Sequence, residues 1–273
     1  QNLYALFKSG NLACLNRGGE ILWQKDLSSY GKDTLYWDFG TSPILSSKHV
    51  IVALMRKGNS WLLAFDPSSG EVAWKKERNY PTPPECDHSY ATPTLIKHKG
   101  KEAILVWGAE RLSAHSAEDG EMHWVSTGFN PKQKKNWVVV GSQVVAGDIA
   151  IVPYGRGTHL AGIRMGGEGD VTKTHRLWTR ADTGCFVPSP AVSDGKVYIL
   201  RDRGAVHCID PKTGKSEWED AFPRASSSYY GSPTIAGTKL YAPREDGVIL
   251  IADISTGFKY LGKYDMGERV IAS

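Results

Sequence analysis

Three adjacent residues carry the side chains of a hydrolytic triad: Asp87, His88 and Ser89. A triad requires the serine, the histidine and the carboxylate to converge in space. Successive side chains of an extended segment point to opposite faces, so we expect no triad among these three residues. The sequence also lacks the Gly-x-Ser-x-Gly nucleophile elbow. We therefore predict no hydrolase and no catalytic residue, and interpret His88 as a hydrogen-bonding residue, with a ligand or a base as the alternative.

Metal and nucleic-acid sites are not indicated either. Neither His-x-x-x-His nor His-Glu-x-x-His occurs, and the four cysteines include no Cys-x-x-Cys pair, so no metal site is predicted. The formal net charge is only +4. The one basic cluster, Lys132 to Lys135, is interpreted as a solvated loop, and we predict no nucleic-acid partner. No apolar run approaches the roughly 20 residues that a membrane-crossing helix needs, so no transmembrane segment is predicted.

A repeated phrase organises the chain around these candidates. It opens with a small residue and proline, as in Ser42-Pro43, Thr92-Pro93 and Ser189-Pro190, and it closes with Gly-x-x-x-Trp. The closing residues lie 40 to 54 positions apart and are Trp23, Trp74, Trp124, Trp178, Trp218 and, replacing Trp, Leu261. A repeat of this length is typical of solenoids and propellers.

Each repeat contains four short strand-like runs. In one copy they are Ala191-Val192, Val197 to Leu200, Ala205 to Ile209 and Ser216 to Trp218, separated by Gly-containing turns. Four short strands per repeat predict an all-β fold, a β-propeller of four-stranded antiparallel blades. We predict a single propeller domain over 1–273, with about six blades visible in a ring of seven or eight. The approximate blade ranges are 1–25 (partial), 40–76, 90–126, 139–180, 187–220 and 230–263, with 267–273 starting another blade.

The repeated residues have structural explanations. Gly70, Gly120, Gly214 and Gly257 are expected to adopt positive φ in the turn before the fourth strand. A carboxylate such as Asp66 can accept N–H bonds from its own turn. The closing residues are predicted to dock between blades, each Trp able to donate its indole N–H. Cys14 and Cys208 occupy one repeat position in blades that are not adjacent, so we expect buried free thiols there. No disulfide is expected between Cys86 and Cys185.

Candidate binding residues are those just before each opening phrase, because the first strand of a propeller blade lines the axial channel. They should ring one mouth of that channel and combine aromatic with polar types, as ligand pockets do. Ordinary capping of the ring is the alternative interpretation. The predicted mouth residues are Trp37, Asp38, Asp87, His88, Trp137, Tyr229, Tyr230 and Arg269.

The stretch from Ala64 to Trp74 resembles the tryptophan-docking motif of quinoprotein propellers, Ala-x-Asp-x-x-x-Gly-x-x-x-Trp. The copy from Cys208 to Trp218 matches with Cys in place of Ala. The chain thus resembles the pyrroloquinoline quinone (PQQ)-like propeller superfamily over nearly its whole length. Tyr229 to Pro233 and Gly166 to Thr172 are similar to the PQQ-like repeat proteins of Planctomycetes. The resemblance implies eight blades and, because the chain starts and stops within blades, an excerpt of a longer array.

Two functions follow from this resemblance. The intact docking motifs predict a non-catalytic propeller that binds a protein or small ligand at the axial mouth, without a cofactor. The resemblance also implies a bacterial protein exported to the periplasm or cell surface. The alternative is a PQQ-dependent dehydrogenase that oxidises an alcohol or sugar with PQQ and calcium. In that family a disulfide between adjacent cysteines often supports the quinone, and this sequence has no adjacent cysteines.

Overall fold

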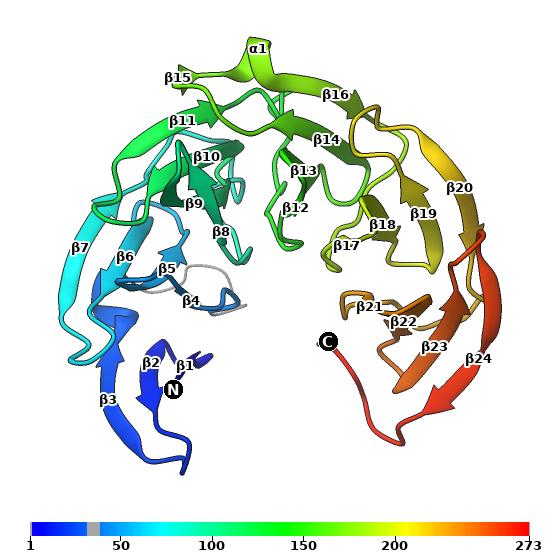
Figure 1. Ribbon diagram of the computed structural model, residues 1–273, viewed down its shortest axis with the longest axis horizontal. Helices are drawn as coiled ribbons and strands as arrows, with labels where there is room; N and C mark the ends of the chain where they lie inside the picture. The colour runs from blue at the N-terminus through cyan, green and yellow to red at the C-terminus, as the bar shows by residue number, and fades with distance from the viewer. Residues whose placement is uncertain (1, 32–38, 273) are drawn as a thin grey trace. The chain divides into compact units, whose positions relative to one another are not determined.

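The computed structural model describes residues 2–31 and 39–272, and its regular elements are almost entirely β-strands (Figure 1). The strands form six sheets. By its internal contacts the chain divides into two compact units, Gln1–Val139 with Gly166–Thr174, and Val140–Met165 with His175–Ser273. We call them unit 1 and unit 2 and describe each by itself. Four-stranded antiparallel sheets in sequence order confirm the predicted β-propeller blades, while the number of blades in a closed ring stays a prediction.

Unit 1 contains three sheets. The first has three strands, and η1 (Leu27–Tyr30) follows them. Its strands are β1 (Leu3–Leu6), β2 (Asn11–Leu15) and β3 (Ile21–Asp26). The second sheet consists of β4 (Ile44–Leu45), β5 (Val50–Leu54), β6 (Trp61–Phe65) and β7 (Val72–Glu77). The third consists of β8 (Thr94–His98), β9 (Lys101–Gly108), β10 (Arg111–Ser116), β11 (Met122–Ser126) and an added strand, β15 (Gly169–Asp170).

Unit 2 contains three four-stranded sheets. The first consists of β12 (Val144–Ala146), β13 (Ile149–Tyr154), β14 (His159–Arg164) and β16 (Arg176–Arg180), which follows the short α1 (Thr172–His175). The second consists of β17 (Ala191–Ser193), β18 (Lys196–Leu200), β19 (Ala205–Ile209) and β20 (Ser216–Ala221). The third consists of β21 (Thr234–Ala236), β22 (Lys239–Pro243), β23 (Val248–Asp253) and β24 (Lys259–Asp265).

The core lies between neighbouring sheets of the same unit. Every residue of β5 is buried, whereas in β7 partly buried side chains alternate with exposed ones. Middle strands are covered on both faces and therefore read as apolar runs, while a strand covered on one face alternates. Ile51 and Leu62 of the second sheet pack in one cluster with Ile104 and Val106 of the third.

The docking tryptophans join adjacent sheets through a glycine and a carbonyl. The indole N–H of Trp23 donates to the Pro67 carbonyl at 3.0 Å, and a Cβ on Gly70 would lie 2.7 Å from the Trp23 ring. In unit 2 the N–H of Trp178 donates to the Pro211 carbonyl at 2.8 Å, beside Gly214. The glycine has positive φ as predicted, but it is also the surface on which the preceding tryptophan stacks.

The turn carboxylates act as predicted, and a shared bulge accompanies them. The Asp66 carboxylate accepts the N–H groups of Ser68 and Ser69 at 2.9 and 2.8 Å. Asn16, which replaces this aspartate in the first copy, accepts the N–H of Gly18 at 2.8 Å. In each sheet the pairing of the third and fourth repeat strands shifts register at one point, for example between Ala64 and Phe65. The sequence did not predict this bulge.

Two docking positions differ from the pattern. Trp124 is fully buried, and its indole nitrogen has no hydrogen-bond partner among the described residues. The strand beside it is β15, which pairs with β11 in parallel and places Gly169 opposite Trp124. Leu261 is 46% exposed, and the register pairs Gly262 rather than Leu261 with Ile251. Leu261 therefore lies at the bulge and does not reproduce the tryptophan geometry.

The cysteines and helices add two findings. Cys14, Cys86, Cys185 and Cys208 are all buried free thiols, as predicted for Cys14 and Cys208, and the absence of a Cys86–Cys185 disulfide also agrees. Within the described residues, no helix has the length and apolar character needed to cross a membrane.

Candidate functional site

The predicted mouth residues fall into three groups. Trp37 and Asp38 lie outside the described residues. Asp87, His88 and Trp137 belong to unit 1, on two loops that are bonded together. Tyr229, Tyr230 and Arg269 belong to unit 2.

Asp87 and His88 form a hydrogen-bonded pair, which corrects the prediction that they point to opposite faces. His88 Nδ1 lies 2.8 Å from Asp87 Oδ1, and the His88 side chain is almost completely buried. The prediction failed because the backbone at Asp87 is a turn rather than an extended strand. Burial raises the pKa of Asp87, but its hydrogen bond to His88 and the charges of His88 and Lys57 outweigh it, so that the pKa lies below its usual value.

Ser89 does not join this pair, as predicted. Its hydroxyl donates to the Trp107 carbonyl at 2.8 Å, and its Oγ accepts the Ala91 N–H at 3.2 Å. Its backbone forms bridges to Met55 and to Val139. The three side chains therefore hold the loop in place, and no nucleophile–base contact exists among them.

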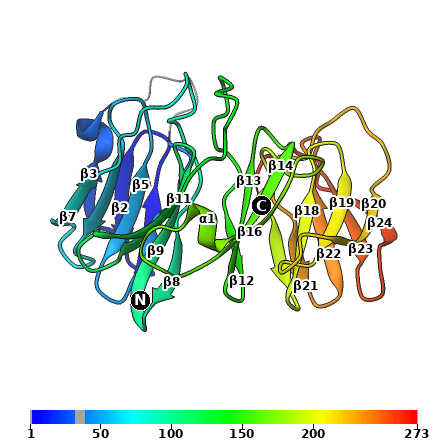
Figure 2. The same ribbon diagram turned by 90° about the horizontal axis from the view of Figure 1, so that it is seen from above.

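Two loops of unit 1, residues 80–89 and 129–139, run together before β8 and before β12, and we call them the paired loops. The Val139 N–H donates to the His88 carbonyl at 3.1 Å, and the Tyr90 N–H to the Val139 carbonyl at 2.9 Å. Further along, the Asn136 N–H donates to the Pro84 carbonyl at 2.9 Å. In Figure 2 the second loop, coloured green, rises beyond the ends of the strands.

Asn130 anchors the second of these loops. It is 2% exposed, and its Oδ1 accepts the Lys134 N–H at 2.9 Å. Its Nδ2 donates to the Lys134 carbonyl at 2.7 Å and to Glu110 Oε1 at 2.5 Å. The thiol of Cys86 also reaches the Lys134 carbonyl, at 3.3 Å. Buried side chains from both loops thus hold the backbone of the second loop at Lys134. The Asn130-Pro131 dipeptide is the sequence signal that could have indicated this turn.

Backbone strain is concentrated here. Glu85, Gln133 and Asn136 adopt positive φ of 66°, 49° and 63°, and the nearby turn residues Ala109 and Glu110 do so as well. Only eight non-glycine residues in the described chain have positive φ, so five of the eight lie on or beside the paired loops. Non-glycine residues in this region cost of order 1 kcal/mol or more each and persist only where the surroundings hold them.

The sides of the paired loops are rich in cations. Lys132, Lys134 and Lys135 are exposed, as predicted, and Lys134 Nζ lies 5.4 Å from the ring centroid of half-buried Trp137. On the other side, Arg56, Lys57 and Asp87 help to line a cavity of about 330 Å³. Beneath the loops Arg78 is buried, and its guanidinium donates to the Gly108 and Arg111 carbonyls at 3.0 Å each.

The unit 2 residues of the predicted mouth are less alike. Tyr229 is 1% exposed and stacks on Phe222 with ring centroids 6.1 Å apart, so it belongs to the core of unit 2. Tyr230 is half-buried, and Arg269 is exposed and pairs with Glu245. Tyr229 was selected because it is aromatic and precedes Ser-Pro, two features that cannot distinguish a core ring from a ligand platform.

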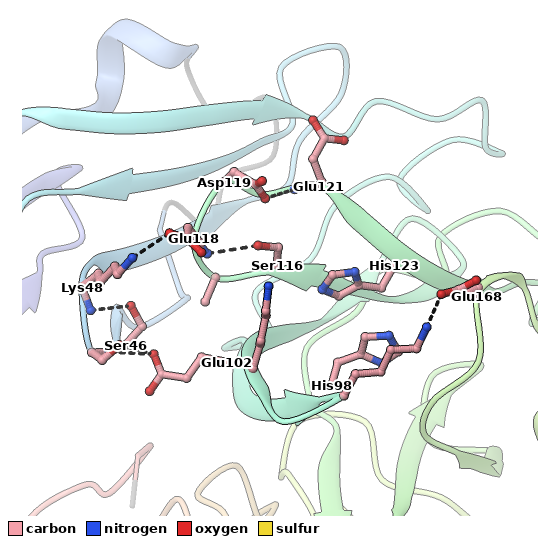
Figure 3. Close-up of a pocket in the computed structure, with 14 residues that line it drawn as sticks. Ser46, Lys48, His98, Glu102, Ser116, Glu118, Asp119, Glu121, His123 and Glu168 are labelled. Atoms are coloured by element: carbon pink, nitrogen blue, oxygen red, sulfur yellow. Dashed lines mark hydrogen bonds and ion pairs between the residues drawn. The ribbon is translucent and has the colours of Figure 1, made fainter.

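A polar pocket that the sequence did not predict lies at the opposite end of β8 (Figure 3). Its volume is about 570 Å³, and the turns β4–β5, β8–β9 and β10–β11 line it together with Glu168. His98 and His123 stack in it with ring centroids 4.4 Å apart. Burial lowers the pKa of His98, helped by the charges of His123 and Lys99. Sequence reasoning missed the pocket because three turns from two sheets build it.

Two ion pairs form within this pocket, and other carboxylates of its lining are held by hydrogen bonds. Lys48 Nζ lies 2.6 Å from Glu118 Oε1, and Lys99 pairs with Glu168. Glu102 accepts both the N–H and the hydroxyl of Ser47, at 2.8 and 2.6 Å. Across the described residues, no group of three or more His, Cys, Asp or Glu side chains is arranged to hold a metal ion.

Similarity to known proteins identifies the family of this chain. The family described as outer membrane protein assembly factor BamB matches residues 8–168 and 169–259. The chain belongs to this family. As a member, it is a PQQ-like repeat β-propeller, which confirms the resemblance found in the sequence. The narrower resemblance to repeat proteins of Planctomycetes stays a prediction. Among curated proteins, no sequence matches significantly.

Solved structures show the same fold. BamB from Moraxella catarrhalis is 18% identical with a TM-score of 0.70, and the match covers 99% of this chain and 74% of that one. Quinohemoprotein alcohol dehydrogenase from Comamonas testosteroni is 12% identical with a TM-score of 0.67, covering 99% and 59%. Sqt1 from Saccharomyces cerevisiae is 12% identical with a TM-score of 0.70, covering 99% and 72%. At such identities these likenesses show the fold alone.

Proposed function

We propose that this protein is a non-catalytic scaffold that binds a protein partner through the paired loops of unit 1. The observation that carries the proposal is the strained, anchored backbone of these loops. Glu85, Gln133 and Asn136 keep left-handed conformations at the surface, where a solvated loop without a task would relax. A loop that is ordered before it meets its partner loses less conformational entropy on binding, which favours recognition.

Family membership supports this function and suggests where it operates. The family carries the description of an outer membrane protein assembly factor, which supports a role in protein assembly. We extend this to the present chain as a periplasmic or cell-surface protein that takes part in an assembly. A non-catalytic scaffold can also bind a small ligand, and the cavity that Arg56 and Lys57 help to line is the site we propose for one.

A PQQ-dependent dehydrogenase remains the alternative function. Its cofactor needs calcium, which prefers six or more oxygen ligands. Among the described residues no acidic cluster of that kind occurs, and the Asp87 carboxylate of the predicted mouth already accepts a hydrogen bond from His88. The residues therefore do not fit the cofactor, and we derive no step through it.

Cross-linking tests the scaffold. A photoreactive amino acid replaces Gln133 at the tip of the second loop, and a control replaces Thr213 in the exposed β19–β20 turn of unit 2. In cells that produce the protein naturally, we expect a protein adduct from position 133 that position 213 does not form, identified by mass spectrometry. No adduct at 133, or the same adduct at both positions, would overturn the proposal.

A second experiment distinguishes the non-catalytic scaffold from a PQQ-dependent dehydrogenase. The purified protein is heated with and without PQQ and calcium chloride, and dye reduction is followed with simple alcohols and sugars. We expect no change in the unfolding temperature and no dye reduction. A ligand at 100 times its Kd would stabilise the protein by about 2.7 kcal/mol. Such a shift, together with alcohol-dependent dye reduction, would replace the scaffold by a dehydrogenase.

A further inference from the structure

The segment of residues 130–137, which we call the lysine loop, presents three ammonium groups from one rigid turn. Lys132, Lys134 and Lys135 are all exposed. The side chains of Lys132 and Lys135 make no hydrogen bond or ion pair with another described residue, while Lys134 lies against the Trp137 ring. By contrast, the exposed lysines Lys48 and Lys99 of the same unit are paired with Glu118 and Glu168. The lysine loop is therefore a concentration of unneutralised positive charge.

The local carboxylates do not cancel this charge. Glu110 is the nearest acid by hydrogen bonding, and its Oε1 already accepts a bond from Asn130. Glu85 is half-buried on the neighbouring loop, and half-buried Asp87 pairs with His88. Three exposed lysines thus stand beside three half-buried carboxylates, none of which forms an ion pair with them among the described residues.

The loop is also held in one conformation. The Asn130 side chain accepts the Lys134 N–H, and it donates to the Lys134 carbonyl, as does the Cys86 thiol. The Gln133 N–H donates to the Asn130 carbonyl at 3.1 Å. Charged groups fixed by the fold steer a complementary partner and set its register, whereas groups on a mobile loop would first have to be ordered.

We infer that the lysine loop binds an acidic segment of a protein partner, one rich in Asp and Glu. This inference rests on the proposed function and names the chemistry of the partner. Carboxylates at successive positions of an extended peptide can reach Lys132 and Lys135 together, and Trp137 offers a half-buried ring beside them. A protein segment is favoured over an anionic membrane because membrane surfaces are recognised by clusters of roughly four to eight basic residues, whereas three lysines of one turn can meet a few carboxylates of one short segment. Nucleic acid also requires a longer basic surface than one turn.

The test uses a fluorescein-labelled peptide of ten glutamates and fluorescence anisotropy on the whole purified chain. We expect saturable binding that weakens as salt rises from about 50 to 300 mM, because the contacts are exposed charges. The double variant Lys132→Glu/Lys135→Glu should weaken binding at least tenfold. The matched control, Lys212→Glu/Lys215→Glu, changes the net charge equally on the exposed β19–β20 turn of unit 2 and should change binding less than twofold. Circular dichroism and the melting temperature check that both variants fold.

Each other outcome overturns the inference. Absence of peptide binding, or equal weakening in the control variant, would show that the lysine loop is not a specific site. Tighter loop-dependent binding to a single-stranded oligonucleotide, or to vesicles containing anionic lipid, would assign the loop to that class instead. If the peptide fails but the adduct at position 133 persists, the scaffold function stands and only the acidic partner is wrong. If both fail, the proposed function falls as well.

Discussion

The sheets β8–β11 and β17–β20 are built alike and differ in what surrounds them. Both keep four antiparallel strands and the same bulge beside the tryptophan. After β20 the chain needs residues 222–233 to reach the next sheet, whereas after β11 it uses residues 127–143 and forms the lysine loop. The third sheet of unit 1 also gains β15 and contains buried His115 where β19 has Ile209. The repeat therefore preserves the four-stranded blade, while the loops and single core positions differ from one blade to the next.

The docking tryptophans give the largest expected effect, and here the sheet β8–β11 with Trp124 is compared with the sheet of β12, β13, β14 and β16 with Trp178. Trp124→Ala should destabilise the protein by about 3–5 kcal/mol, because the side chain is fully buried. Trp124→Phe should reduce the free energy of unfolding clearly less than Trp178→Phe does. Of these two tryptophans, only Trp178 has a carbonyl acceptor for its indole N–H, so only its replacement removes a hydrogen bond. Urea unfolding monitored by circular dichroism measures both pairs. Equal costs for the two Phe variants would contradict the described environment of Trp124.

His115 should make the third sheet of unit 1 sensitive to acid. Burial, together with the charge of Arg78, lowers its pKa in the folded protein to about 3, against about 6.5 in the unfolded chain. At pH values between these two pKa values, His115 is protonated in the unfolded chain and neutral in the folded protein. The free energy of unfolding therefore falls as the pH decreases from about 6.5 towards 3. The expected loss between pH 6.5 and 5 is about 1.6 kcal/mol.

His115→Ile, which introduces the residue of β19, sharpens this test. Stability measured by urea unfolding at pH 7, 6 and 5 should fall less steeply in the variant, by up to about 1.4 kcal/mol per pH unit. His98 and His207, whose pKa values are also lowered mainly by burial, should leave a residual slope. Identical slopes in variant and wild type would show that His115 does not titrate as described.

A docking glycine should tolerate a side chain less well than an ordinary turn glycine. A Cβ on Gly120 would lie 2.7 Å from the Trp74 ring, and its φ is 75°. Gly237, with φ of 57° and no atom within 4 Å of an added Cβ, is the matched control. Gly120→Ala should cost about 1–2 kcal/mol more than Gly237→Ala, because only the first adds a clash to the backbone strain. Thermal unfolding compares the two, and equal effects would mean that the tryptophan moves aside freely.

The smallest expected effect on global stability concerns the loop anchor. Asn130→Ala removes three hydrogen bonds of the lysine loop and should cost about 1 kcal/mol, because most of the freed groups can bond to water. The same change should greatly increase amide hydrogen exchange of residues 132–136 while β9 and β10 stay protected. The loop before β21 serves as the internal reference. Unchanged exchange at 132–136 would show that Asn130 does not hold the loop.

The fold was predictable to the level of strands, and the site was not. The four runs of the repeat starting at Ser189 became β17 to β20 within one to three residues, because alternation and glycine turns are local signals. Asp87 and His88 were selected as candidates and were given the wrong geometry, because no local pattern indicated the turn at Asp87. Asn130 was overlooked altogether, since its partners, Glu110 and Lys134, become visible only when the chain is folded.

The sequence by itself determined the strands of each blade, the positive-φ turn and the position of each tryptophan within its repeat, since all of these depend on local patterns of a few residues. Only the tertiary structure decided that β15 joins the sheet of β11, that Tyr229 is core, and that turns from two sheets enclose the polar pocket. It also decided that Lys132 to Lys135 belong to an anchored loop. These features depend on residues distant in sequence, whose proximity is set by the packing of whole sheets, and no local periodicity encodes that packing.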